Sequence, residues 1–240
     1  MPDDPFNISL NAATAESGIS NNCKKSPFQC SNPFPLTCIN HGEDISVRCG
    51  RWRTCPGCSL WKQWTLKQRL MAGIENVPAG KMPMFFTLTF PLASAPDEDE
   101  AHRAWRSLVA RLRYRDYLGA YGWVLQRQRN GTLHFHGIAH LPWFADGLAE
   151  WRELLVKSRF GVQNKLVVAD LQHASYCAKY ISTGLAELAP LRRAYGFSRG
   201  FPLSGYEQER RLVAQQLPLL QEQFGIEPEC SWLPEWELRC

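Results

Sequence analysis

The stretch Leu133-His134-Phe135-His136-Gly137 sets the architecture that we expect for this 240-residue chain. It follows Asn130-Gly131, a dipeptide typical of a tight hairpin turn, so the spacing predicts a strand at 133–140 paired with one at 123–128. Successive side chains of a strand point to opposite faces, and the two histidines therefore share one face. Two imidazoles in this arrangement can bind one metal ion.

A second stretch, Tyr176-Cys177-Ala178-Lys179-Tyr180, follows about forty residues later. It lies on a predicted helix that Asp170 caps and that runs to about residue 182. Phenols at Tyr176 and Tyr180 share one helix face with Lys179. Such a pair more often packs in a core, but beside a histidine pair it indicates phosphodiester chemistry with a tyrosine nucleophile. A phenol has a pKa near ~10 and needs activation, which Lys179 can supply by favouring the phenolate or neutralising charge on phosphorus.

The strand opposite the histidines offers Gln126 and Gln128 as oxygen ligands. We predict Gln126 as the third ligand, because the hairpin brings it across from His134. Imidazole favours Mn²⁺, Co²⁺, Ni²⁺ or Zn²⁺ over Mg²⁺. Without a carboxylate, the site is expected to bind Mg²⁺ weakly by itself, and a DNA phosphate can complete it.

The order of the predicted elements favours an α+β fold. Apolar periodicity predicts strands at 82–90, 123–128, 133–140 and 165–169, and helices at 59–77, 102–117, 151–158 and 170–182. This order is typical of an antiparallel-rich sheet of the split β-α-β type rather than a doubly wound parallel sheet.

Six of the nine cysteines lie between residues 23 and 58, which argues for metal rather than a disulfide framework. Cys55-Pro56-Gly57-Cys58 is a C-x-x-C knuckle, and thiolates at this spacing can complete a tetrahedral Zn²⁺ site. The predicted zinc ligands are Cys49, Cys55 and Cys58, with Cys38 as the fourth and His41 or Cys30 as rivals. The alternative is a redox pair, which normally starts a helix in a β-α-β setting.

The net charge of +4 is modest, but the cations are clustered. Stripes of this kind suit a polyphosphate partner, although they are also common on solvated helix faces. The arginines that we predict to contact DNA are Arg51, Arg53, Arg192, Arg193 and Arg199.

The chain divides into five expected segments. They are a disordered tail at 1–22, a zinc-binding module at 23–60, a linking helix at 61–80, a catalytic domain at 81–200 and a C-terminal helical segment of unknown role at 201–240. An apolar content of 45% supports a packed core. No apolar run reaches the ~18 residues of a membrane span, and the acidic N-terminus is not a secretory signal, so we expect a cytoplasmic protein without a membrane partner.

Three motifs together resemble the HUH endonucleases, which initiate rolling-circle replication. Phe85-Phe86-Thr87-Leu88-Thr89-Phe90 is similar to their first motif, and His134-Phe135-His136 to their histidine–hydrophobe–histidine motif. Tyr176-x-x-Lys179-Tyr180 resembles the third motif of the two-tyrosine branch, found in phage and plasmid initiators and in some single-strand transposases. The resemblance covers roughly residues 38–200, although the family often has glutamate where this chain offers Gln126.

The resemblance implies a five-stranded antiparallel sheet with flanking helices, preceded by a small zinc-binding module. It implies an enzyme that nicks and rejoins single-stranded DNA, or an origin hairpin, through a 5′-phosphotyrosine intermediate with Mn²⁺ or Mg²⁺. The partners would be a helicase and a polymerase of a bacterial host. A transposase of the same superfamily and a zinc-dependent DNA-binding protein without catalysis are the alternatives.

Overall fold

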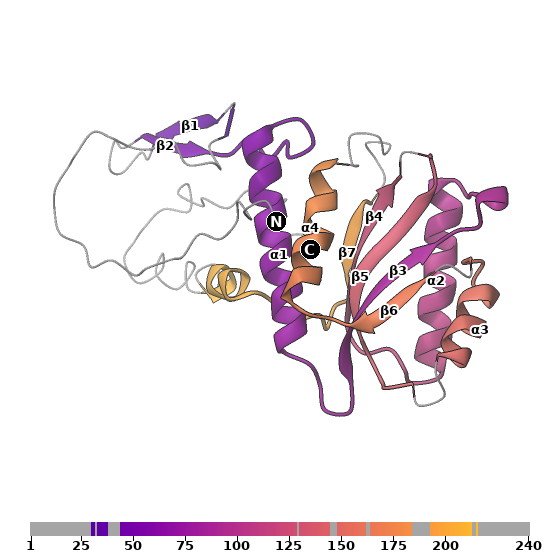
Figure 1. Ribbon diagram of the computed structural model, residues 1–240. Helices are drawn as coiled ribbons and strands as arrows, with labels where there is room; N and C mark the ends of the chain where they lie inside the picture. Colours follow the sequence, from indigo (N-terminus) through magenta and orange to yellow (C-terminus); the bar gives the residue numbers. More distant parts are fainter. Residues whose placement is uncertain are drawn as a thin grey trace.

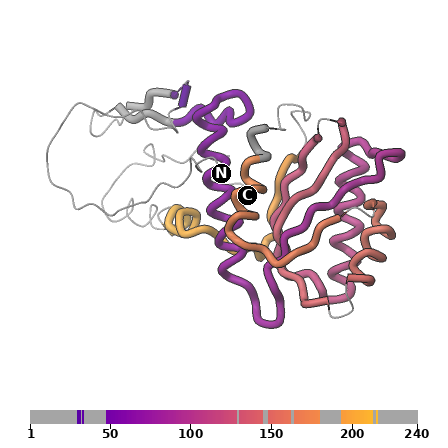
Figure 2. Tube along the Cα trace, in the orientation of Figure 1, coloured from indigo at the N-terminus to yellow at the C-terminus, as the bar shows by residue number. Residues whose placement is uncertain are grey.

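We describe the chain from a computed structural model (Figures 1 and 2). The structure describes residues 30–31, 33–37, 44–128, 130–144, 148–161, 164–183, 193–212 and 215. The predicted tail at 1–22 lies outside these residues, as do Cys38, His41 and Arg192. None of the helices described is long and apolar enough to cross a membrane.

The centre of the structure is a five-stranded sheet in the order β6-β3-β5-β4-β7. The strands are β3 (Met82–Thr89), β4 (Tyr121–Arg127), β5 (Leu133–Leu141), β6 (Lys165–Val168) and β7 (Tyr195–Phe197). Each neighbouring pair is antiparallel. The predicted α+β class and antiparallel sheet are therefore confirmed. The three-residue strand β7 was not predicted, because so short a segment has no readable period.

The hairpin that joins β4 to β5 fixes the register of the histidines. Gly131 has φ +85°, a left-handed conformation that glycine adopts without strain. The amide of Gln128 donates to the carbonyl of Thr132 at 2.8 Å and closes the loop. In the resulting ladder Gln126 pairs with His134, and Val124 pairs with His136.

Helices cover both faces of the sheet (Figure 1). One face carries α2 (Glu98–Tyr114) and α3 (Ala149–Lys157), and the other carries α1 (Pro56–Glu75) and α4 (Leu171–Thr183). The acidic start of α2 is a capping box, in which the Asp97 carboxylate accepts from the Glu100 amide and the Glu100 carboxylate accepts from the Asp97 amide.

Because side chains alternate along the strands, the sheet has one apolar face and one face that carries the histidines. Phe135 and Phe86 point toward α2 and stack against Trp105, with ring centroids 5.3 and 5.5 Å from it. His134 and His136 point to the opposite face, toward α4. Since both sides of β5 are covered, all nine of its residues are buried.

The segment before the sheet contains a separate hairpin of β1 (Phe34–Thr37) and β2 (Asp44–Val47). Helix α1 then begins at Pro56, three residues earlier than the apolar period predicted, because proline is favoured in the first helical turn. Cys55 is its N-cap and Cys58 lies in its first turn. The C-x-x-C pair thus does start a helix, but the preceding strand belongs to the separate two-stranded sheet and not to a β-α-β unit.

Candidate functional site

His136 lies at the centre of a polar group on the α4 side of the sheet. Its Nε2 lies 2.9 Å from Oε1 of Gln126 on β4, and its Nδ1 lies 3.1 Å from the hydroxyl of Thr87 on β3. The imidazole is only 2% exposed. Burial, aided by the charge of His134, lowers the pKa of His136 to about 3. At neutral pH the ring is therefore uncharged, which is the state that binds a metal ion.

His134 lies beside His136, with the two rings nearly parallel and their centroids 6.2 Å apart. Its Nδ1 lies 3.3 Å from the side-chain nitrogen of Gln128, and its Nε2 lies 3.1 Å from the hydroxyl of Thr132. Burial lowers the pKa of His134 as well. Both ring nitrogens are thus engaged within the hairpin, and His134 can act as a ligand only by exchanging one of these contacts.

Gln126 meets a different histidine from the one that the sequence indicated. Its backbone is the ladder partner of His134, as expected, but its side-chain oxygen contacts His136. Diagonal neighbours on a twisted sheet lie within reach of a long side chain, which explains the difference. Nε2 of His136 and Oε1 of Gln126 fit two adjacent ligands of one divalent ion, because the ion would replace the proton that now lies between them.

Tyr176 of α4 closes this group from the helix side. Its ring stands edge-on to His136, with centroids 5.4 Å apart, and edge-on to Phe85 of β3 at 5.7 Å. The side chain is 42% exposed, so the ring also faces solvent. Tyr176 is therefore both next to the candidate metal ligands and accessible to a macromolecular substrate.

The other two residues of the tyrosine motif are Lys179 and Tyr180. Lys179 lies one turn after Tyr176 on α4 and is exposed. The backbone of Tyr180 belongs to α4, but its side chain lies outside the residues described. The structure thus brings together His134, His136, Gln126 and Tyr176, while the position of the second phenol stays a prediction.

Thr87 contacts His136, and His173 packs beside this group against Phe85; neither residue is among the site residues predicted from the sequence. Thr87 lies within the predicted strand at 82–90, but only the pairing of β3 with β5 shows that its side chain lies on the face of the histidines. His173 lies 4.3 Å from Phe85 between ring centroids, and its Nδ1 lies 2.7 Å from the Asp170 carboxylate. Asp170 also accepts from the His173 amide at 3.0 Å, as expected of a helix cap.

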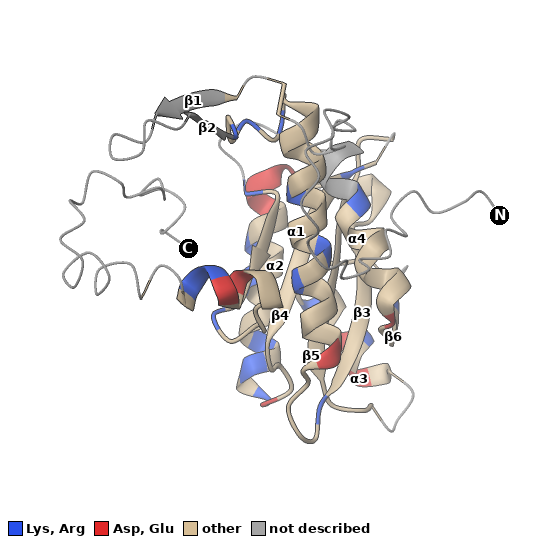
Figure 3. Cartoon of the chain, turned by 90° about the vertical axis from the view of Figure 1, so that its left-hand side faces the viewer, with Lys and Arg blue, Asp and Glu red and all other residues tan. Residues whose placement is uncertain are grey.

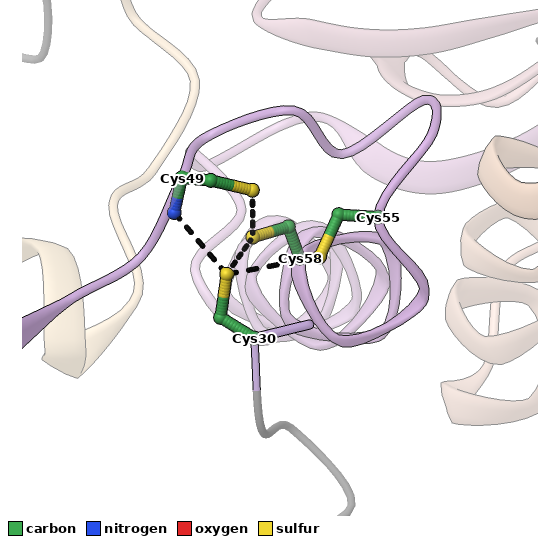
Figure 4. Close-up of side chains that lie close together, drawn as sticks. All are labelled: Cys30, Cys49, Cys55 and Cys58. Carbon is green, nitrogen blue, oxygen red and sulfur yellow. Dashed lines mark hydrogen bonds between the residues drawn. The ribbon is translucent and has the colours of Figure 1, made fainter. Parts of the chain in front are cut away.

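Four cysteines form a second group at the start of α1 (Figure 4). Their sulfur atoms all lie within 4.8 Å of one another. The Cys30–Cys55 separation is 3.7 Å, and the Cys49–Cys58 and Cys30–Cys58 separations are each 3.6 Å. A tetrahedral site with zinc–sulfur bonds of ~2.3 Å has edges of ~3.8 Å, so the group fits a zinc ion.

Cys30 completes this group, although the prediction preferred Cys38 as the fourth ligand and treated Cys30 as a rival. Cys38 lies outside the residues described and is not tested. The spacing of the chain could not rank the two, because the loop between them determines which thiol returns to the knuckle. Sequence and structure agree on Cys49, Cys55 and Cys58 as members of the group.

Backbone amides and burial act in opposite directions on these thiols. Hydrogen bonds from the amides of Cys58 and Ser31 lower the pKa of Cys55 to about 5. Burial raises the pKa of Cys58 to about 12. The group therefore holds one thiolate that amides stabilise, together with thiols that lose their protons only when a cation compensates the charge. These four cysteines can bind a structural metal such as zinc.

Four of the five arginines predicted to contact DNA are among the described residues, two just before α1 and two on either side of β7. Arg51 is exposed, and the guanidinium of Arg53 lies 5.1 Å from the centroid of Trp52, which packs against the cysteine group. Arg193 donates from Nε to the carbonyl of Tyr195 at 3.2 Å, and Arg199 is exposed in the turn after β7. Figure 3 views α1 and α4 in front of the sheet, with lysine and arginine positions along α1.

Comparison with known proteins gives one match. A family model described as replication-associated protein ORF2/G2P matches residues 83–185. This range, less than half of the chain, contains all of β3 except Met82, the histidine pair and Tyr176. No curated protein and no solved structure matches the chain. The match supports a replication initiator family, and the matched range includes the residues that form the His136 group.

Proposed function

We propose that this protein initiates rolling-circle replication by nicking and rejoining single-stranded DNA through Tyr176. The observation that carries the proposal is the contact between Tyr176 and His136, with centroids 5.4 Å apart, within the segment that resembles replication-associated proteins. A phenol and a neutral imidazole beside an amide oxygen form a suitable group for attack on a metal-bound phosphate.

His134, His136 and Gln126 would hold the divalent ion, Mn²⁺ or Mg²⁺. When bound, the ion would act as a Lewis acid on the phosphate that is attacked. With the ion bound, Nδ1 of His136 would carry the ring's one proton and donate it to the Thr87 hydroxyl of β3, 3.1 Å away, which would leave Nε2 as the coordinating nitrogen.

The proposed reaction is a transesterification. The Tyr176 oxygen forms a bond to phosphorus and loses its proton, while the bond from phosphorus to the 3′ oxygen breaks and that oxygen gains a proton. The products are a 5′-phosphotyrosine and a free 3′-hydroxyl. Lys179, one helical turn away, is suited to stabilise the phenolate or the charge that develops on the phosphate. The reverse reaction rejoins the strand without ATP, because the covalent link conserves the phosphodiester bond.

The cysteine group would serve this reaction by holding the basic segment that contains Arg51 and Arg53. Structural zinc at Cys30, Cys49, Cys55 and Cys58 would fix the path of that segment against α1. Arg193 and Arg199 would contact the same DNA. A helicase and a polymerase of a bacterial host would unwind the template and extend the 3′-hydroxyl.

A covalent-adduct assay tests the proposal. The protein is incubated with Mn²⁺ and a diverse pool of single-stranded DNA labelled at the 3′ end, because the fragment with the 5′ phosphate stays on the protein. We expect a labelled band at the protein's mass on a denaturing gel that Tyr176→Phe abolishes. Tyr180→Phe tests the second phenol, and Tyr114→Phe, at a 91% exposed tyrosine on α2, is the matched control.

Two results would contradict the proposal. A band that persists in Tyr176→Phe would assign the nucleophile to another residue. Bound DNA with no band in the wild type would favour a DNA-binding protein without catalysis.

A further inference from the structure

Lys165 extends the row of side chains that contains His136. In the ladder between β6 and β3, Lys165 pairs with Thr87, and in the ladder between β3 and β5, Thr87 pairs with His136. Directly opposed residues of antiparallel strands point to the same face, with Cβ atoms about 5 Å apart. Lys165 therefore lies on the α4 side of the sheet, about 10 Å from His136 between Cβ atoms.

The Lys165 side chain turns toward the aromatic ring that also contacts Tyr176. Its Nζ lies 5.6 Å from the centroid of Phe85, whose ring is 5.7 Å from that of Tyr176. Phe85 is buried, so it provides a fixed support for both neighbours. The ammonium and the phenol thus border the same ring, one from β6 and the other from α4.

Lys165 is available to an anionic ligand. The residue is exposed, and across the part of the chain that the structure describes it forms no ion pair with a carboxylate. An ammonium is a compact point charge on a flexible stem, a form that suits a phosphate oxygen. Single-stranded DNA that lies across Tyr176 presents phosphates on both sides of the one attacked.

We propose that Lys165 binds a backbone phosphate of the DNA strand next to the phosphate that Tyr176 attacks. The inference rests on the proposed function, because it takes the substrate to be single-stranded DNA. With this contact, the DNA continues from Tyr176 toward the β6 edge of the sheet.

A lysine on an edge strand can instead serve only to prevent pairing with another sheet. That role needs an exposed polar side chain at the edge and no specific ligand. Lys165→Gln keeps such a side chain and removes the charge, whereas Lys165→Arg keeps the charge. Lys157→Gln is the matched control, since Lys157 lies on α3, across the sheet from Tyr176, and pairs with Glu153.

The test measures binding of a fluorescent single-stranded oligonucleotide pool by anisotropy at several salt concentrations. We expect Lys165→Gln to weaken binding about tenfold, the size of one charged hydrogen bond. The slope of log affinity against log salt should fall in magnitude by about 0.7, the value for one phosphate contact on a single strand. The DNA affinity of Lys165→Arg should stay within about twofold of the wild type because the charge is retained. The affinity of Lys157→Gln should stay within the same range because Lys157 lies far from the proposed DNA path.

The adduct assay separates this inference from the proposed function. At saturating DNA, Lys165→Gln should reach the wild-type adduct yield, whereas Tyr176→Phe should form none at any concentration. Wild-type affinity and an unchanged salt slope in Lys165→Gln would overturn the inference, whether or not an adduct forms. If the wild type forms no adduct but Lys165→Gln still loses affinity and slope, the phosphate contact stands and the transesterification fails.

Discussion

Replacing Cys30 by serine tests the metal group at the start of α1. The perturbation removes one sulfur from a set in which three of the sulfur–sulfur separations are 3.6 to 3.7 Å, close to the ~3.8 Å of a tetrahedral zinc–thiolate site. It also removes the acceptor of the Cys49 amide, which lies 3.3 Å from Sγ of Cys30. Serine is nearly the same size but is a poor zinc ligand, so the change acts on coordination more than on packing.

The expected magnitude follows from the number of ligands. Structural zinc binds small domains with about 10–16 kcal/mol at pH 7. Divided over four thiolates, this is about 2.5–4 kcal/mol for each, or a hundredfold to a thousandfold in affinity. We expect Cys30→Ser to weaken zinc binding by at least that hundredfold, and the apparent stability of the module to fall as the ion is lost.

Zinc content is measured by mass spectrometry of the purified protein, and affinity by competition with a chromogenic chelator. Cys38→Ser is the decisive comparison, because Cys38 is the ligand that the sequence preferred. Cys177→Ser, at a buried cysteine of α4, controls for the loss of any thiol. The reasoning fails if Cys30→Ser keeps one tightly bound zinc per chain while Cys38→Ser loses it.

Three further predictions concern the histidine site and the sheet that holds it. Gln126→Glu should tighten Mg²⁺ and Mn²⁺ binding in calorimetric titrations, because a carboxylate is the harder oxygen ligand; unchanged affinity would remove Gln126 from the ligand set. Gly137→Ala should lower the free energy of unfolding in urea by about 3 kcal/mol or more, because a Cβ there would lie 2.2 Å from the Gly122 carbonyl oxygen. Gly200→Ala is the control and should leave the free energy of unfolding unchanged, because a Cβ there meets nothing within 4 Å. The depressed pKa of His136, about 3 in the folded chain against about 6.5 unfolded, contributes stability that is present above pH 6.5 and is lost as the pH falls. Between pH 7.5 and 5.5 the wild type should lose about 1.4 kcal/mol more than His136→Gln, and equal losses would show that this imidazole does not resist protonation.

The sequence predicts those strands of the sheet in which apolar and polar residues alternate or a turn motif is present. The alternation around His134 and His136 and the turn at Asn130-Gly131 predicted the β4–β5 hairpin, and the structure has it with Gln126 opposite His134. The contact of the Gln126 side chain with His136 was not predictable, since it depends on sheet twist and on side-chain length.

Features that depend on the path of the chain between elements were not readable from the sequence. Cys30 and Cys38 have equivalent chemistry, and only the fold of the intervening segment decides which thiol reaches Cys58. From the sequence, Lys165 is only one residue of a short predicted strand. Its pairing with Thr87 in the structure places it in the same row of side chains as His136. Non-local pairing of this kind leaves no periodic signal in a single sequence.

Helix α1 connects the two sites and limits how far a change at one reaches the other. Its first turn carries Cys58, while Leu66 and Leu70 are buried in the main core. Near its C-terminus, Nε2 of His140 on β5 donates to the carbonyl of Gly73 at 2.7 Å, which satisfies one of the acceptors that the end of a helix leaves open.

These anchors hold most of α1 against the sheet independently of the cysteines. Loss of the metal should therefore release the first turn and the segment with Arg51 and Arg53, while the contact between His136 and Tyr176 persists. If the two sites have the roles that we propose, metal removal should weaken DNA binding more than it slows the reaction at saturating DNA. An equal loss of both would place the cysteine group within the catalytic unit rather than in a DNA-holding module.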